Sequence, residues 1–209
     1  AKSEIYIPVS AILPYSITIG DLQSISYWTN KPGDSGSPDW TFYIYTALGT
    51  GTGANEASWY HTRLNSEPYL TGTPSASDPS NTWHEWSTGD PANPMRFYDA
   101  GRDGGIYGTY TDPTLANLEA GAINWNSYNS VYANNTYDYR GDVISKFSLQ
   151  TGSAWGNGFQ GMVDGVTIAL NNGDTVKLNL DAVPEPASVV MLLTMVGLVG
   201  GALRRKAKK

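Results

Sequence analysis

Cysteine is absent from this chain of 209 residues, and histidine occurs only twice, at His61 and His84. The absence of cysteine excludes disulfides and thiolate metal sites, and two histidines are too few for a typical histidine-based zinc site. His84-Glu85 begins like a zinc-protease motif, but position 88, where the second histidine would stand, holds Thr88. We therefore expect His84 to be a strand-surface residue. The chain also lacks a serine nucleophile elbow and a glycine-rich phosphate loop that opens a helix.

Basic residues are scarce in the first 182 positions, which hold eight Lys and Arg against 18 Asp and Glu and so carry a net charge of −10. Five of the 13 basic residues stand in the last six positions, so the overall charge of −6 conceals an acidic body and a basic tail. Because nucleic-acid phosphates require a basic face, nucleic acid is not an expected partner. An acidic body is compatible with neutral glycans and with divalent cations.

An uncharged and predominantly apolar run of 17 residues lies in the tail, at residues 187–203. Its length is at the short end of what crosses a bilayer as a helix, and we predict a single transmembrane helix there. The segment Val183-Pro184-Glu185-Pro186 precedes it. We expect a turn there, because its two prolines continue neither a strand nor a helix. The basic residues of 204–209 follow. Because Lys and Arg beside an apolar segment stay in the cytoplasm, we expect the C-terminus inside and the body outside.

These three parts, in this order, closely resemble the PEP-CTERM sorting signal of Gram-negative bacteria that make exopolysaccharide. The resemblance covers residues 183–209. The residues that match the signal are Val183, Pro184, Glu185, Pro186, Arg204 and Arg205. The resemblance implies that exosortase, an integral-membrane cysteine transpeptidase, recognises the tail and cuts near the motif. It also implies an exported protein of the cell envelope or extracellular matrix that is anchored transiently, with a signal peptide ahead of Ala1.

The body, residues 1–182, has the composition of an exported all-β domain. The chain has 14 Tyr and seven Trp, and turn-forming Gly, Ser, Thr and Asn are frequent. Ten to twelve short strands are predicted, with the strongest at 40–48, others at 15–19 and 95–98, and a hairpin joining 163–170 to 175–180. One helix is predicted from Asp112 as its cap to Gly121. This pattern predicts a β-sandwich of the jelly-roll kind.

A second resemblance concerns the body. Trp83-His84-Glu85-Trp86, the helix, and residues 158–168 with the sequence Gly-Phe-Gln-Gly-Met-Val-Asp-Gly-Val-Thr-Ile resemble exported jelly-roll domains of the concanavalin- or lectin-like sort. The resemblance supports the fold and makes Asp164 the first candidate ligand for a calcium ion. Other loop aspartates could also offer hard oxygen ligands. They are Asp34, Asp39, Asp99, Asp103, Asp138 and Asp142.

The many aromatic residues favour carbohydrate binding. Trp59, Trp83 and Trp86 could form an exposed platform for sugar rings, as could Trp28 with Tyr43 and Tyr45; alternatively these rings fill the core. The sequence thus predicts a structural or carbohydrate-binding module with extracellular polysaccharide as its partner, and it assigns no catalytic residue. The alternative is a polysaccharide-active hydrolase or lyase. That enzyme would use Glu85 together with Glu67 or Glu56 as its two carboxylates.

Overall fold

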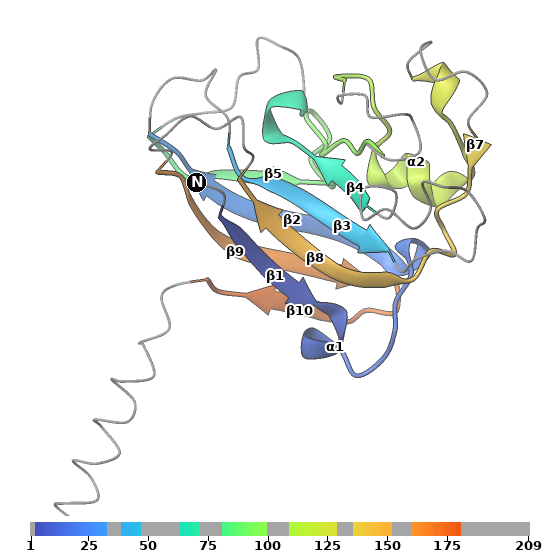
Figure 1. Cartoon of the computed structure of the whole chain (residues 1–209), viewed down its shortest axis with the longest axis horizontal. Helices are drawn as coiled ribbons and strands as arrows, with labels where there is room; N and C mark the ends of the chain where they lie inside the picture. Colours follow the sequence, from blue (N-terminus) through green and yellow to red (C-terminus); the bar gives the residue numbers. More distant parts are fainter. Residues whose placement is uncertain are drawn as a thin grey trace, which may run out of the picture. The chain divides into compact units, whose positions relative to one another are not determined.

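The computed structural model describes residues 3–32, 39–46, 63–71, 81–99, 109–128, 136–151 and 160–180 (Figure 1). The chain divides into two compact units, residues 1–178 and 179–209. The first unit contains all the described strands and helices.

Two four-stranded antiparallel sheets make up the first unit. The first sheet has the order β1 (Glu4–Pro8), β8 (Ile144–Gln150), β3 (Thr41–Thr46) and β4 (Arg63–Ser66). The second sheet has the order β10 (Thr175–Leu178), β9 (Met162–Leu170), β2 (Leu22–Asn30) and β5 (His84–Ser87). The predicted strong strand at 40–48 is confirmed as β3, which lies between β8 and β4.

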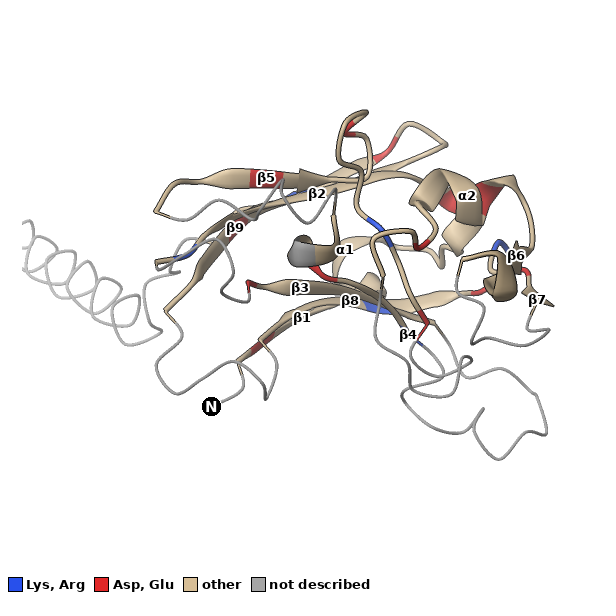
Figure 2. Ribbon diagram, turned by 90° about the horizontal axis from the view of Figure 1, so that it is seen from above, with Lys and Arg blue, Asp and Glu red and all other residues tan. Residues whose placement is uncertain are grey.

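The two sheets lie one above the other as separate layers (Figure 2). Their inner faces meet through aromatic rings. Tyr27 of β2 stacks on Phe42 of β3 with ring centroids 5.6 Å apart, and Phe42 lies 5.9 Å from Phe147 of β8. All three rings are fully buried. The period-2 alternation of each strand therefore delivers its apolar side chains to one shared core, and the expectation of a sandwich-like all-β body is confirmed.

Short elements connect the strands. They are α1 (Val9–Ile12), η1 (Ile19–Asp21), η3 (Pro68–Leu70), α2 (Leu115–Ala120), β6 (Ile123–Asn124), η4 (Trp125–Ser127) and β7 (Thr136–Tyr137). The strands predicted at 15–19 and 95–98 are wrong, because these segments form only isolated bridges, such as that from Thr18 to Val143. Pro14 and Pro94 stand just before them and lack the N–H that a continuing ladder needs.

The predicted helix is confirmed as α2, but its cap is different. Thr114, not Asp112, is the N-cap, and its hydroxyl accepts the N–H of Asn117 at 3.4 Å in a reciprocal capping box. Asp112 instead accepts the hydroxyl of Thr109 at 2.9 Å. Gly121 ends the helix, as predicted.

The predicted C-terminal hairpin is confirmed. β9 and β10 pair antiparallel across residues 171–174, and Gly173 supplies the positive φ of +95° that this turn requires. Within the described ranges, no helix has both the length and the apolar composition needed to cross a membrane. The sorting motif at 183–186 and the transmembrane helix predicted at 187–203 lie outside the described residues.

Candidate functional site

Two neighbouring strands of the second sheet bring exposed tryptophans together. In β2, Tyr27 points into the core and Trp28 points outward with 39% of its surface exposed. Trp28 stands directly opposite Glu85 of the edge strand β5. Trp83, just before β5, is 44% exposed and shares the outward face with Glu85, as the alternation predicts. Two exposed indoles and a carboxylate therefore meet on one face of the sheet.

These three side chains line a pocket with a volume of about 550 Å³. The remaining lining residues are polar or small: Ser24, His84, Ser87, Gly89 and Asp90. The pocket thus combines two indoles with two acidic side chains and two hydroxyls. Sites that recognise small molecules combine apolar walls with a few placed polar groups in the same way. We refer to it as the Trp28–Trp83 pocket.

A β-bulge in β9 supports Trp28. Between the pairs Ser26–Thr167 and Trp28–Asp164, β9 holds one residue more than β2. The extra backbone position is used by Gly165, whose φ of +61° lies in the left-handed region. A Cβ at this position would stand 2.9 Å from Cδ1 of Trp28. The indole therefore rests on the bare backbone of Gly165, which no other residue type would allow without displacement.

His84 adds no positive charge to the pocket at neutral pH. Burial lowers the pKa of His84 below its usual value, although Asp90, Asp39 and Glu85 act in the opposite direction. Its ring packs edge-on against Trp86, with centroids 4.4 Å apart. Asp90 is held in place by its own turn, where one carboxylate oxygen accepts the N–H groups of Ala92 and Asn93 at 2.8 and 3.2 Å.

Trp86 does not belong to the exposed platform that the sequence suggested. It is only 4% exposed, and its indole N–H donates to the Thr29 hydroxyl at 2.8 Å. Thr29 donates in turn to Asp39 at 2.6 Å. The alternation of β5 places Trp86 inward because Trp83 and Glu85 point outward. Of the other platform candidates, Tyr43 and Tyr45 are buried in the first sheet, and Trp59 lies outside the described residues.

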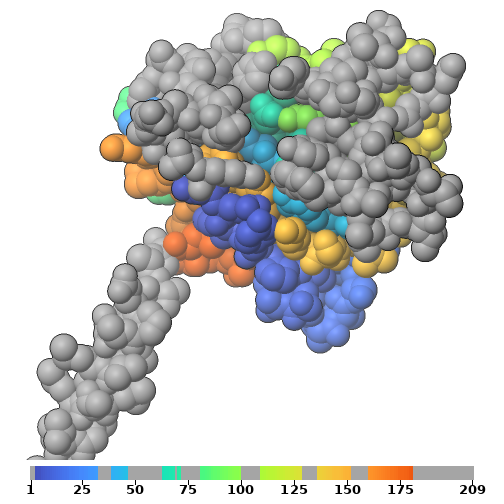
Figure 3. Space-filling view, viewed as in Figure 1, coloured from blue at the N-terminus to red at the C-terminus, as the bar shows by residue number. Residues whose placement is uncertain are grey.

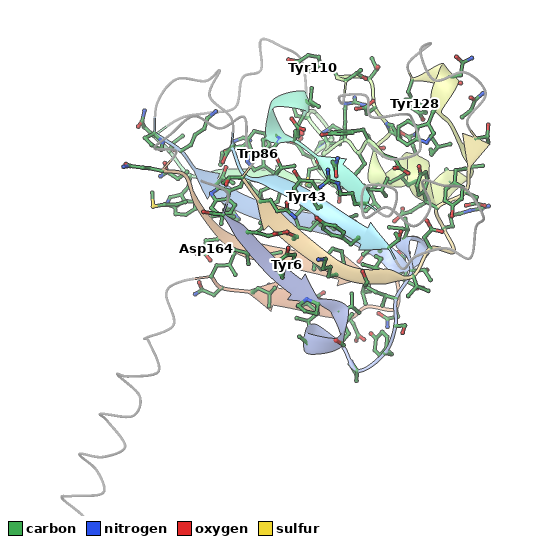
Figure 4. The ribbon with its side chains drawn as sticks, viewed as in Figure 1. Tyr6, Tyr43, Trp86, Tyr110, Tyr128 and Asp164 are labelled. Atoms are coloured by element: carbon green, nitrogen blue, oxygen red, sulfur yellow. The ribbon has the colours of Figure 1, made fainter. Side chains whose placement is uncertain are left out.

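The aspartates considered as calcium ligands are dispersed. Among the described residues, no three acidic or histidine side chains gather as a metal site. Asp164 lies in β9 and accepts the N–H of Gly165 at 2.6 Å (Figure 4). Asp39 and Asp99 are buried and accept hydroxyl groups, Asp142 accepts the Tyr137 hydroxyl, and Asp138 pairs with Arg140. Asp34 and Asp103 lie outside the described residues, and a calcium ion at Asp164 stays a prediction.

The carboxylates proposed as a catalytic pair occupy different parts of the sandwich. Glu85 lies on the outer face of the second sheet, whereas Glu67 follows β4 of the first sheet and accepts the Tyr98 hydroxyl. Burial raises the pKa of Glu67, although Tyr98 and Arg63 act against this. Glu56 lies outside the described residues. The second acidic residue of the pocket is Asp90, which sequence reasoning missed because the turn after β5 decides where it lies.

Comparison with known proteins identifies the tail. Residues 182–206 match the family model described as the PEP-CTERM protein-sorting motif. Neither a curated protein nor a solved structure matches the chain. The motif implies processing by exosortase and the sorting of an exported protein to the cell surface through a C-terminal anchor. It confirms the resemblance of the tail, but it gives no function for the body, and no lectin family is identified.

Proposed function

We propose that the body is an interaction module of the cell envelope or extracellular matrix that binds neutral polysaccharide in the Trp28–Trp83 pocket without cleaving it. The observation that carries this proposal is the pair of exposed indoles beside Glu85. A tryptophan exposed by about 40% keeps a large apolar ring face in water, and stacking with a sugar ring removes that face from water. Glu85, Ser24 and Ser87 can hydrogen-bond the hydroxyl groups at the rim of such a ring.

Charge favours a neutral polymer. Glu85 and Asp90 are the acidic residues of the pocket, and the body carries a net charge of −10. A uronate or sulfate polymer would be repelled by this field. The lectin-like jelly-roll fold is also part of the proposal. It is supported by the way the chain crosses repeatedly from one sheet to the other. Residence in a Gram-negative envelope, with transient anchoring and a cytoplasmic C-terminus, is also part of it and is supported by the tail motif.

Electrophoresis through gels that contain dextran, mixed-linkage β-glucan or galactomannan tests the binding proposal. The full chain is used in a zwitterionic detergent without a sugar headgroup, because a glycoside detergent would compete. We expect at least one polymer to retard the protein, and Trp28→Ala and Trp83→Ala each to weaken binding about 30-fold, the loss of about 2 kcal/mol typical of a central aromatic contact. Tyr15→Ala, at an exposed tyrosine that does not line this pocket, is the matched control. Equal retardation of all four proteins would contradict the proposal.

The runner-up function, a polysaccharide hydrolase or lyase, has one observation in its favour. Glu85 and Asp90 line the same pocket, and glycosidases use two carboxylates. Incubating the retained polymers with the protein and measuring new reducing ends separates the two functions. We expect none to form. Reducing ends that appear with the natural chain and disappear with Glu85→Gln would establish the enzyme instead.

A further inference from the structure

The acidic side chains of the Trp28–Trp83 pocket have no positive partner among the described residues. No described group forms an ion pair with Glu85 or donates a hydrogen bond to its carboxylate. Asp90 accepts two backbone N–H groups of its own turn, but both reach Oδ1 and leave Oδ2 without a described donor. The pocket lining holds no lysine or arginine, and His84 is uncharged at neutral pH because burial lowers its pKa. A neutral sugar would leave this negative charge unpaired.

The neighbouring strands add to the negative charge around Trp28. The register places Glu85 of β5 directly opposite Trp28 on one side and Asp164 of β9 on the other. Lys177 of β10 is the one lysine or arginine in the four described strands of this sheet. It pairs with Thr167 of β9, so two interstrand spacings, about 10 Å, separate its strand from β2. A cation at the pocket therefore meets acidic residues on both sides of Trp28.

The aromatic rings of the first sheet already have cations of their own. Lys146 Nζ lies 4.0 Å from the ring centroid of Tyr6, and the Arg63 guanidinium lies 4.9 Å from that of Tyr43. Figure 3 views the molecule from the side of this sheet, with β1 in dark blue, β3 in cyan and β8 in gold. In the second sheet, no described lysine or arginine lies over either indole of the pocket. Because aromatic faces attract cations, these indoles are open to a cation that a ligand brings.

The chemistry of the pocket lining narrows the kind of cation. A calcium ion needs about six to eight oxygen ligands, and among the described residues no three acidic or histidine side chains gather as a metal site. An ammonium group needs fewer partners, because its three N–H donors are satisfied by two carboxylates and one hydroxyl. Glu85, Asp90 and the hydroxyls of Ser24 and Ser87 supply acceptors of this kind. The indoles suit an attached sugar ring, which stacks on them.

We propose that the pocket prefers sugar units that carry a free amino group, so that the polymer held there is an aminoglycan. The sugar ring stacks on Trp28 and Trp83, and its ammonium group donates to Glu85 and Asp90. This inference rests on the proposed function and extends it from neutral sugar units to cationic ones. It assigns the two carboxylates a role that stacking alone does not require. The advantage over a neutral unit is about 5-fold, the ratio that two exposed ion pairs supply.

Nuclear magnetic resonance of the ¹⁵N-labelled full chain tests the preference, in a polyoxyethylene detergent that carries neither sugar nor charge. The indole N–H resonances of Trp28 and Trp83 are assigned with Trp28→Phe and Trp83→Phe. They are followed at pH 7, where most such amines are protonated, during titration with methyl glycosides of glucose and galactose and of their 2-amino and 2-acetamido derivatives. We expect at least one 2-amino glycoside to bind about 5-fold more tightly than its neutral counterparts at about 20 mM salt.

Salt and a peptide control show whether the amine is recognised by its charge and on a sugar. At about 500 mM salt the ratio should fall below about 2, because exposed charges are then screened. Tri-lysine carries ammonium groups without a sugar ring and should shift the two indole resonances far less. If no amino glycoside binds more tightly than its neutral counterparts, or if the ratio persists at high salt, the proposal is overturned. Equal shifts with tri-lysine would reveal a general cation site and would overturn it too.

Substitutions identify the carboxylates that hold the amine. Glu85→Gln and Asp90→Asn keep the size of each side chain and remove its charge, so each should lower the ratio from about 5 to about 2. Asp138→Asn is the matched control, because it removes an acidic charge outside the pocket and should leave the ratio unchanged. If Glu85→Gln and Asp90→Asn both keep the full ratio, the proposal is overturned. The salt series on the natural chain decides the question if a variant does not fold.

The titrations also separate this inference from the proposed function. Equal binding of amino and neutral glycosides would support the pocket as a sugar site and overturn the preference. Binding of amino glycosides alone would support the preference and restrict the proposed function to cationic polymers. If no glycoside binds, this inference is overturned, while electrophoresis with the neutral polymers decides the proposed function independently.

Discussion

The indole of Trp28 rests on the backbone of Gly165, where an added Cβ would lie 2.9 Å from Cδ1 of the indole. The contact joins the central strand β2 to a bulge in β9 and sets the direction in which Trp28 leaves the sheet. A residue exposed to water would otherwise sample several rotamers. The bulge therefore pre-organises one wall of the Trp28–Trp83 pocket.

Gly165→Ala is expected to damage both stability and binding. The positive φ alone costs roughly 1–2 kcal/mol, and the Cβ also pushes the Trp28 ring away. Urea unfolding should show the loss of stability, and gel retardation should show weakened binding by the folded variant. Gly173→Ala is the matched control, because its φ is also positive but nothing lies within 4 Å of its Cβ. If the two variants bind glycan equally well, Gly165 does not position Trp28.

Replacing Trp83 or Trp86 by Phe should lower the unfolding free energy by very different amounts. Trp86→Phe leaves a gap in the core and removes the donor to Thr29, so we expect a loss of about 2–3 kcal/mol in unfolding free energy. Trp83→Phe changes an exposed ring and should cost about 0.5 kcal/mol or less. Urea unfolding of both variants measures the difference. Similar losses in the two variants would mean that Trp86 is not the buried member of the pair.

Much of the fold could be predicted because the relevant signals are local. The aromatic and β-branched run at 41–46 is suited to an interior strand, and the turn at 171–174 fixes a hairpin through a glycine with positive φ. The segment at 15–19 also reads as a strand, but only Thr18 pairs, because Pro14 and the turn at Gly20 interrupt the ladder. Whether a short apolar run pairs depends on its neighbours in space, which propensity alone does not contain.

The candidate site was only partly predictable. Period-2 alternation correctly placed Trp28 on the opposite face from Tyr27, and Trp83 with Glu85. It could not predict that Trp28 and Trp83 line one pocket, because this depends on pairing between β2 and β5, which are far apart in the sequence. Alternation also shows that Trp83 and Trp86 point to opposite faces, and this excludes Trp86 from the platform proposed for it.

The unfolding free energy should fall as the pH rises from about 4 to about 6 because of Asp112. Burial raises the pKa of this carboxyl from 3.8 to about 6, although the Thr109 hydroxyl and N–H and the charge of Arg96 act in the opposite direction. In this window Asp112 keeps its proton in the folded chain but has released it in the unfolded chain. The stabilising contribution of Asp112 is therefore fully present below pH 4 and is lost as the pH rises through 6. The expected loss is at most about 3 kcal/mol.

Asp112→Asn should remove the part of this fall that Asp112 causes, as measured by urea unfolding at intervals from pH 2 to pH 7. Asp138→Asn is a control of opposite sign. Hydrogen bonds from Arg140 lower the pKa of Asp138 to about 2, so its contribution is present above pH 4 and lost as the pH falls toward 2. If the unfolding free energies of the natural chain and of Asp112→Asn change with pH in parallel, Asp112 has the same pKa in the folded and in the unfolded chain.

The mass of the protein recovered from its native surface or medium shows whether the tail has been cleaved off. We expect a C-terminus near Pro184 or Pro186, because exosortase processing is implied by the motif at 182–206. Replacing both prolines by alanine should leave a chain that ends at Lys209, whereas Ser188→Ala should be processed normally. Processing should not alter the unfolding free energy of the body, since its compact unit ends at Leu178, before the motif. A natural chain that retains Lys209 would instead be permanently anchored, and its glycan partners would then have to lie within reach of the bilayer.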